Sequence, residues 1–379
     1  MDKMADVLGR AGAWCGQNKY LSAIKNAFQN FMPLTIAGAI GVLWCNVLVN
    51  ESTGLGIFFK PIMALEFLNP AFQAVNFCTI SCITVGITLG IAQEIGVWNM
   101  GAERAGYIPG LVGLAAWLSV TNTSHMVEGA KEAFTGIAGN ELGATGLFTG
   151  MIIGVLSVEL FCFFEKQDAL KIKMPEQVPP GVARAFEVLV PATITLIITA
   201  CIGSACYNLT GLYLNDVIKN GIQGPLGAVG ATIPGVMIIY LVIMLFWLVG
   251  IHGNNMLSAV KEALFTPLAL ENVEAFNKGE TPTNIINMYF LQMCGEFGGS
   301  GVTIGLVIAI MIFGKREDNK AIAGLSLVPG LFNINETVTF GIPMVLNPIL
   351  GIPFVFACLV TILVGYVLTV IGFCPVACL

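Results

Sequence analysis

The sequence predicts an all-α membrane protein whose chain crosses the bilayer many times. Of its 379 residues, 56% are hydrophobic and 11% are charged, and the mean hydropathy is +0.83. Soluble domains carry about 25% charged residues. Apolar runs long enough to cross a bilayer recur along the chain. These observations exclude a soluble protein and predict a polytopic protein of the cell membrane, in contact with the lipid bilayer.

Residues 1–27 are expected to form an amphipathic helix on the cytoplasmic surface of the membrane. Leu8, Ala11, Trp14 and Cys15 recur at helical spacing, and basic residues are spread among them. The segment lacks the flanked apolar core of a cleavable signal peptide.

Six apolar segments follow, each close to the ~20 residues that cross a bilayer. They are residues 28–49, 72–93, 107–123, 144–164, 186–209 and 226–250. A charged, proline-containing stretch, 165–185, interrupts them and is typical of a linker outside the membrane. The sequence therefore predicts an N-terminal helical half, 28–164, and a C-terminal half, 186–379.

The basic residues predict the orientation of the chain. Twelve of the 17 lysines and arginines fall in the N-terminal segment, the 94–106 loop, the 165–185 linker and the loop around Arg316. Three lysines fall in loops on the opposite side. The positive-inside rule places the N-terminus and the linker in the cytoplasm.

Beyond residue 250 the apolar segments are short and interrupted. Gly298-Gly299-Ser300-Gly301 separates the segments 285–297 and 302–313, and a final apolar run covers about 348–373. Broken segments at membrane depth point to the binding site of a transporter.

The stretch from Ala321 to Phe354 is apolar at both ends and polar at its centre, Phe332-Asn333-Ile334-Asn335-Glu336-Thr337. Glycines and prolines on both sides break a continuous helix. Freed backbone groups and a carboxylate persist at membrane depth only inside protein or beside a wet cavity. The residues leave two interpretations: a re-entrant hairpin that carries Glu336 into a polar cavity, and a short cytoplasmic loop.

A second polar stretch runs from Trp247 to Asn255, where an apolar helix ends in a glycine-flanked histidine and two amides. His252 can accept a proton or bond to a ligand hydroxyl, and Trp247 can offer a flat face to a sugar ring. The same residues also suit a helix end at the membrane interface, with Trp247 in the aromatic belt and His252 capping carbonyls.

His252 and Glu336 together suit a ligand with many hydroxyl groups, because nearby amides supply donors and acceptors. For Glu296, just before Gly298, binding and structural roles are both open. The candidate ligand-binding residues are Trp247, Asn254, Asn255, Glu296, Asn333 and Asn335. For the remaining groups, Glu159 is expected to have a structural role at the interface and His125 to lie on a solvated loop.

Other classes of site find little support in the sequence. The 11 cysteines include no Cys-x-x-Cys pair, and those in apolar runs, such as Cys78 and Cys201, are expected to be buried, reduced thiols. Two histidines far apart in sequence predict no metal site. The phosphate-loop, zinc-protease and nucleophile-elbow motifs are absent from the sequence, and no cofactor is expected. The net charge of −6 gives no indication of nucleic-acid binding.

Three separated stretches together resemble one family. They are Ile172-Lys173-Met174-Pro175-Glu176 with the prolines that follow, Gly250-Ile251-His252-Gly253-Asn254, and FNINETVTFGIPMVLNPILGIPF. In this order they resemble enzyme IIC, the membrane component of the lactose/cellobiose/diacetylchitobiose branch of the sugar phosphotransferase system.

The resemblance implies a homodimeric permease for a β-linked disaccharide, with about ten spans and two re-entrant hairpins. It implies that the N-terminal half forms the dimer contact and that the C-terminal half binds the sugar. His252 and Glu336 match the family's site residues beside the hydroxyl that becomes phosphorylated, and Trp247 matches an aromatic residue near the sugar. Cytoplasmic enzyme IIB, charged through enzyme IIA, brings the phosphoryl group on a cysteine.

The sequence departs from the family pattern at two places. Thr337 stands where the family usually has proline after Asn-Glu, which we expect to loosen the backbone at the hairpin tip. The chain stops at Leu379, where relatives continue with a Pro-Trp-Thr-Thr-Pro type segment and a last helix, so we expect a shortened C-terminus.

Two other functions fit the same residues. An ion-coupled sugar symporter would use Glu336 or Glu296 as proton carrier. An intramembrane hydrolase would use Glu336 and His252, although glycosidases need two carboxylates about 5–10 Å apart.

Overall fold

The computed structural model describes residues 6, 7, 10, 13, 14, 17–51, 55–125, 134–175, 177–225, 230–331, 333–342, 344 and 347–378. Regular structure in this part is helical, apart from one antiparallel pair of two-residue strands, β1 (Ser124–His125) and β2 (Phe134–Thr135). The predicted all-α character is therefore confirmed in its main feature. The chain divides into two compact units, Lys19–Pro225, and Leu226–Leu379 together with Met1–Asn18.

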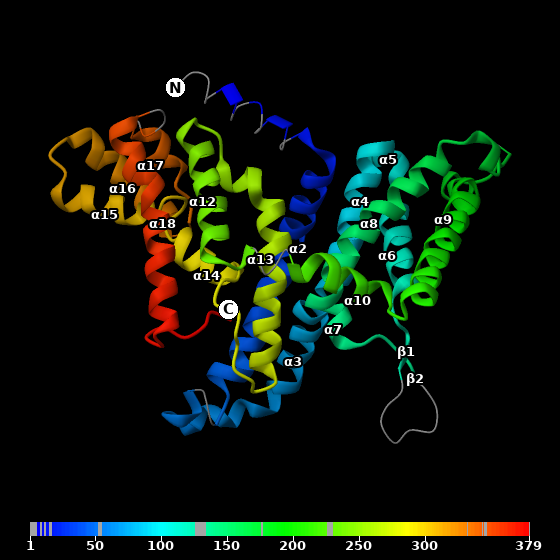
Figure 1. Ribbon diagram of the computed structural model, residues 1–379, viewed down its shortest axis with the longest axis horizontal. Helices are drawn as coiled ribbons and strands as arrows, with labels where there is room; N and C mark the ends of the chain where they lie inside the picture. The colour runs from blue at the N-terminus through cyan, green and yellow to red at the C-terminus, as the bar shows by residue number, and fades with distance from the viewer. Residues whose placement is uncertain are drawn as a thin grey trace. The chain divides into compact units, whose positions relative to one another are not determined.

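The unit Lys19–Pro225 is a bundle of helices around α4 (Figure 1). Its α-helices are α2 (Lys19–Leu43), α3 (Asn69–Cys78), α4 (Ile83–Met100), α5 (Ala102–Ala105), α6 (Ile108–Val120), α7 (Gly139–Leu142), α8 (Ala144–Glu165), α9 (Pro180–Thr210) and α10 (Leu214–Ile218). Short 3-10 helices cover Leu55–Ile57, Lys60–Leu68, Ile80–Cys82 and Asp168–Leu170, and π-helical turns cover Trp44–Leu48 and Lys219–Gln223.

Helix α4 is central because it buries one stripe and packs against α2, α6 and α8. Ile83, Ile87, Ile91 and Ile95 recur every fourth residue and are at most 2% exposed. The hydrophobic effect does not drive helices together inside lipid, so close packing through small residues matters more. At Gly113 of α6 an added Cβ would lie 2.3 Å from the Cβ of Ala92, so glycine is required for this approach.

Among the described residues, five helices have the length and composition to cross a membrane, and these cover Lys19–Leu48, Lys60–Met100, Thr145–Glu165, Pro180–Thr210 and Ile349–Val370. Three shorter apolar helices cover Ile108–Val120, Ile233–Leu248 and Thr303–Phe313. A membrane protein with several helical spans is therefore confirmed, whereas the number ten stays a prediction. The boundary between the compact units falls after Pro225, beyond the 165–185 linker, because α9 packs with α6 and α8.

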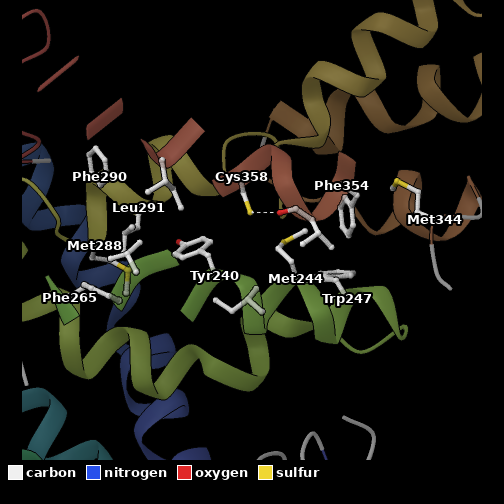
Figure 2. Packing of buried hydrophobic residues seen from close by; sticks show 14 of the residues in the cluster. Tyr240, Met244, Trp247, Phe265, Met288, Phe290, Leu291, Met344, Phe354 and Cys358 are labelled. Atoms are coloured by element: carbon white, nitrogen blue, oxygen red, sulfur yellow. Dashed lines mark hydrogen bonds between the residues drawn. The ribbon is translucent and has the colours of Figure 1, made fainter. Parts of the chain in front are cut away.

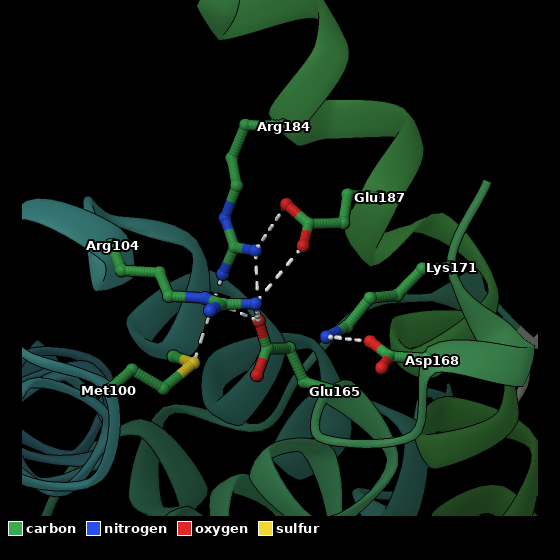
Figure 3. A network of polar contacts seen from close by, with 7 residues as sticks. All are labelled: Met100, Arg104, Glu165, Asp168, Lys171, Arg184 and Glu187. Atoms are coloured by element: carbon green, nitrogen blue, oxygen red, sulfur yellow. Dashed lines mark hydrogen bonds and ion pairs between the residues drawn. The ribbon is translucent and has the colours of Figure 1, made fainter. Parts of the chain in front are cut away.

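The linker begins and ends at one network of charges (Figure 3). Glu165, whose side chain is 3% exposed, accepts hydrogen bonds of 2.9 Å from Arg104 Nε and from Arg184 Nη1. Both arginines also bind Glu187 in the first turns of α9, at 3.0 and 2.8 Å. Arg184 lies 3.8 Å from the Met100 sulfur as well. The network ties α4, α5, α8 and α9 together at the end of the bundle where the linker lies.

The predictions for Glu159 and His125 can be compared with the structure of this unit. Glu159 pairs with Lys19 at 2.5 Å and accepts a 3.3 Å hydrogen bond from Asn99, which supports its structural role. His125 lies in β1 and is half-buried, with Nε2 3.2 Å from the Asn122 carbonyl oxygen, so it is less exposed than expected. The loop that follows His125, and most of residues 1–27, lie outside the described residues.

The cysteine expectation is partly wrong. The ten described cysteines are free thiols, and Cys162 and Cys358 are buried, as predicted. Cys78 and Cys201 are exposed on the surface of the protein. An apolar run in a membrane protein suits a lipid-facing surface as well as a core, so hydropathy alone could not place these thiols.

The second unit carries the broken segments. Its helices are α12 (Ile233–Leu248), α13 (Gly253–Asn277), α14 (Met288–Gly295), α15 (Thr303–Phe313), α16 (Glu317–Leu331), α17 (Glu336–Gly341) and α18 (Pro348–Val370). Helix α12 packs against α13 and α18, and α15 against α16. Tyr240, Met244 and Trp247 of α12 point into a core shared with Phe354 and Cys358 of α18 (Figure 2).

The short elements match the predicted interruptions. Helices α14, α15 and α17 have 8, 11 and 6 residues, fewer than the ~20 needed to cross a bilayer. Turns at Glu296–Val302 and Asn333–Asn335 separate them from their neighbours. Whether these turns are the tips of re-entrant hairpins stays a prediction.

We predict that Glu165→Ala lowers the free energy of unfolding by about 2 kcal/mol. Breaking a fully buried ion pair costs about 3–5 kcal/mol, and the half-exposed Arg104 reduces the loss here. The measurement is denaturant unfolding of the purified protein in detergent. Asp168→Ala is the matched control, since this exposed carboxylate pairs only locally with Lys171 at 3.0 Å, an interaction that holds the pKa of Asp168 below its usual range. Equal stability of both variants would contradict the prediction.

Candidate functional site

His252 is positioned by the start of α13. It occupies the N-cap, and its Nδ1 accepts a 3.2 Å hydrogen bond from the backbone N–H of Asn255. With Nδ1 as acceptor, a neutral imidazole carries its proton on Nε2. The sharp connection from α12 needs Gly253, where an added Cβ would lie 2.0 Å from the Ile243 carbonyl oxygen. The ring thus caps an N–H group at the start of α13, and the interpretation that His252 caps carbonyls stays a prediction.

The ring of His252 lies against Trp247. The two ring centroids are 4.4 Å apart at an angle of 46°. Trp247 is fully buried, so its placement in an aromatic belt at the membrane surface is wrong. By sequence alone, a tryptophan at the end of an apolar helix fits an aromatic belt and a protein core equally well. In the structure Trp247 belongs to the core because it packs in one cluster with residues of α18. The contact between Trp247 and a sugar stays a prediction.

The Gly298–Gly301 turn, between α14 and α15, collects three of the predicted amides. Asn254 Nδ2 donates to the Ser300 hydroxyl oxygen at 2.9 Å. Asn333 Oδ1 accepts from the Gly298 N–H at 2.8 Å, and Asn335 Nδ2 donates to the Ser300 carbonyl oxygen at 2.7 Å. The structure therefore brings together the helix start beside His252 and both broken segments. Sequence reasoning missed Ser300, although its place among three glycines marked the turn.

The structure describes the side chains of Asn254 and Asn255 but not that of Glu336. Asn255 is exposed, and its backbone N–H bonds to His252. Asn254 is half-buried, and its Oδ1 is a buried acceptor without a protein donor in the described part of the chain. Glu336 opens α17 directly after Asn335, and its side chain lies outside the described residues, as does Phe332.

Glu296 is the third predicted carboxylate, and it lies directly before the turn. Its Oε1 accepts a hydrogen bond from the Tyr240 hydroxyl at 2.7 Å and pairs with Lys261 of α13. The side chains of Lys261 and Glu296 are 7% and 15% exposed. These two contacts thus anchor the residue before the turn to α12 and α13.

Lys261 is the functional candidate that sequence reasoning missed. It lies in α13 with Glu262 next to it, and Glu262 accepts a 2.5 Å hydrogen bond from the Thr266 hydroxyl. A charge inside an apolar segment of a membrane protein is by default a functional candidate. That signal was present in the sequence.

The arrangement combines an imidazole, amides, a hydroxyl and a paired carboxylate around one turn. Such groups can recognise a polyol, and the imidazole can take up a proton. Among the described residues, no cluster of three or more His, Cys, Asp or Glu side chains is placed to hold a metal ion.

Comparisons with known proteins agree with one another. Residues 25–358 match the family described as phosphotransferase system, EIIC. The oligo-beta-mannoside-specific EIIC component of Bacillus subtilis (strain 168) is 32% identical over 99% of this chain and 83% of its own. The lactose-specific EIICB component of Staphylococcus haemolyticus (strain JCSC1435) is 30% identical over 91% of this chain and 57% of its own.

The fold also matches a solved structure. The crystal structure of the transporter ChbC, the IIC component from the N,N'-diacetylchitobiose-specific phosphotransferase system, superposes with a TM-score of 0.87. It is 29% identical and covers 97% of this chain and 84% of the solved chain.

We predict that Lys261→Met lowers the free energy of unfolding by about 3 kcal/mol, because it leaves the Glu296 carboxylate buried without its cation. The double variant Lys261→Met/Glu296→Gln should recover most of this loss, since both charges are removed and Tyr240 keeps an acceptor. Denaturant unfolding in detergent measures both. Lys320→Met is the control, because Lys320 pairs with the exposed Glu317. A double variant as unstable as Lys261→Met would show that the pair is not what stabilises this region.

Proposed function

The chain belongs to the phosphotransferase system EIIC family, and we propose that its substrate is a β-linked disaccharide of the cellobiose, diacetylchitobiose or lactose type. It is the membrane permease component of a sugar phosphotransferase system. The observation that carries the proposed substrate is the TM-score of 0.87 with the diacetylchitobiose IIC component, at 29% identity over 97% of this chain. The relative specific for oligo-beta-mannosides supports the same class of sugar.

The proposed sugar site surrounds the Gly298–Gly301 turn. His252 and Glu336 lie beside the hydroxyl that becomes phosphorylated. The position of His252 next to Asn254, and of Glu336 next to Asn335, supports this, because both asparagines bond to Ser300. The other proposed sugar contacts are Trp247, Asn254, Asn255, Glu296, Asn333 and Asn335.

The reaction transfers a phosphoryl group from a cysteine of EIIB to a sugar hydroxyl. The sulfur–phosphorus bond breaks, an oxygen–phosphorus bond forms, and the thiolate stays on EIIB. The hydroxyl proton goes to Nδ1 of His252, which first gives up the hydrogen bond that it accepts from the Asn255 N–H. EIIC works with EIIB, as the name of the lactose-specific relative, an EIICB component, indicates. EIIA would recharge EIIB.

The proposed organisation follows the two halves of the chain. Residues 28–164 form the contact of a homodimer, and residues 186–379 bind the sugar between two re-entrant hairpins. The partly exposed apolar helix α2 in this part of the chain supplies surface for such a contact and for lipid. A mass measurement in detergent that gave only monomers would contradict the dimer.

Product analysis tests the function. Membrane vesicles containing the protein are supplied with disaccharide, with and without phosphorylated EIIB. A phosphorylated disaccharide that appears only with EIIB supports the proposal. Intact free disaccharide that accumulates without EIIB would favour an ion-coupled symporter. The structural observation in favour of that alternative is the buried Lys261–Glu296 pair. Released monosaccharides would favour a hydrolase.

We predict that the N-terminus and the linker face the cytoplasm, since twelve basic residues share their side. In a variant whose native cysteines, including the exposed Cys78 and Cys201, are replaced by serine, Lys171→Cys should react with an impermeant thiol reagent only after the cells are opened. Lys60→Cys, expected outside, is the control. Labelling of Lys171→Cys in intact cells would reverse the topology.

We predict that Glu336→Gln weakens sugar binding about tenfold or more, and more than Glu296→Gln does. Hydrogen bonds from sugar hydroxyls to a carboxylate are worth roughly 1.5–3 kcal/mol each. Glu296 already accepts from Tyr240 and Lys261, so it has less capacity for a ligand. Calorimetry on the purified permease measures both. An affinity of Glu336→Gln equal to that of wild type would place the sugar elsewhere.

We predict that His252→Gln slows phosphoryl transfer by about 100-fold or more and weakens sugar binding less. General-base help is worth roughly 10²–10⁴-fold in rate, and glutamine hydrogen-bonds but is a poor base. The measurement pairs sugar affinity with single-turnover product formation in the presence of EIIB. The chain's other histidine provides the control, His125→Gln. A rate that fell only in proportion to sugar occupancy would make His252 a binding residue.

A further inference from the structure

Ser300 connects the two segments that carry the proposed catalytic residues. Its hydroxyl oxygen accepts a 2.9 Å hydrogen bond from Asn254, two residues after His252. Its carbonyl oxygen accepts a 2.7 Å hydrogen bond from Asn335, directly before Glu336. One residue therefore holds the start of α13 and the start of α17 at the same turn.

The two hydrogen bonds to Ser300 are shielded from solvent. Ser300 and Asn335 are each 3% exposed. Asn335 is the N-cap residue of α17, yet its side chain does not cap that helix. An N-cap asparagine usually bonds to the N–H groups of its own first turn. Here the Asn335 amide donates to the Ser300 carbonyl oxygen instead. It thus links α17 to the turn, and the first turn of α17 receives no side-chain cap from it.

The turn is shaped for this approach. Gly299 has φ +94°, and a Cβ there would lie 2.4 Å from the Cβ of Asn335. Asn333 adopts φ +62°, and its Oδ1 holds the Gly298 N–H at 2.8 Å. Left-handed backbone at a non-glycine residue is uncommon and is tolerated best by asparagine. The two asparagines therefore fix the register between the broken segments.

We propose that Ser300 is a positioning residue for phosphoryl transfer: it fixes the start of α13, which carries His252, relative to the start of α17, which carries Glu336, and does not itself contact the sugar. Ser300 is 3% exposed, and its hydroxyl and carbonyl oxygens both accept hydrogen bonds from asparagines. Transfer depends on the placement of reacting groups, and a misplacement of about 1 Å can cost 100-fold in rate. Sugar binding is spread over many hydroxyl contacts and is less sensitive to such a shift. The inference rests on the proposed function.

The test is Ser300→Ala, which removes the hydroxyl acceptor and keeps the carbonyl. Single-turnover transfer from phosphorylated EIIB should fall about tenfold, while the dissociation constant of the disaccharide stays within about threefold. Ser326→Ala is the matched control, because Ser326 is 1% exposed in the same unit and its hydroxyl bonds to the Ile322 carbonyl within α16. The control should change neither quantity.

A second variant covers the case in which Ser300→Ala does not fold. Ser300→Cys keeps a side chain of similar length with a weak acceptor, so we expect a smaller loss of rate at unchanged affinity. Thermal unfolding in detergent checks each variant.

The outcomes separate the two proposals. Wild-type protein that forms no phosphorylated disaccharide with EIIB would contradict the proposed function. An active wild type whose Ser300 variants lose rate and affinity in proportion, or lose neither, would overturn the positioning role.

Discussion

The Gly298–Gly301 turn and the three asparagine side chains that bind it are the constraint on which the second unit depends. Short helices at membrane depth leave backbone groups that water cannot satisfy, so protein groups must do so. The Gly298 N–H and the Ser300 carbonyl are satisfied by Asn333 and Asn335. The same bonds bring the helix start at His252 and the start of α17 to one place. The hydrogen bonds that satisfy the backbone of the turn are therefore the same ones that assemble the candidate site.

Buried charges complete this arrangement. A charge in an apolar interior is costly unless it is paired and hydrogen-bonded. Lys261 and Glu296 meet this condition beside the turn. The buried Glu165 meets it at the linker through Arg104 and Arg184. The first cluster anchors the Gly298–Gly301 turn, whereas the second joins the helices on either side of the 165–185 linker. Only 11% of the residues are charged, and in both clusters the ion pairs hold these side chains at defined positions.

Much of the fold class could be predicted from composition. Apolar runs of bilayer length identify helices because a lone segment in lipid must satisfy its own backbone. The interrupted stretches around His252 and Asn335 were also visible in sequence, since glycine, proline and amides break an apolar pattern wherever they occur. Burial was harder to predict: Trp247 lies in the core and Cys78 on the surface, because hydropathy does not distinguish protein from lipid as the apolar neighbour.

The sequence by itself determined that this is a helical membrane protein, and it named candidate site residues in the broken C-terminal segments. The tertiary structure alone decided the partners: Ser300 for Asn254 and Asn335, and Lys261 for Glu296. These residues are 35 to 46 positions apart in the chain. Local pattern reports only on neighbours within a helix turn or a strand, whereas a hydrogen bond between distant residues depends on how the helices pack. For that reason the chemistry-bearing residues could be named from sequence, and their links could not.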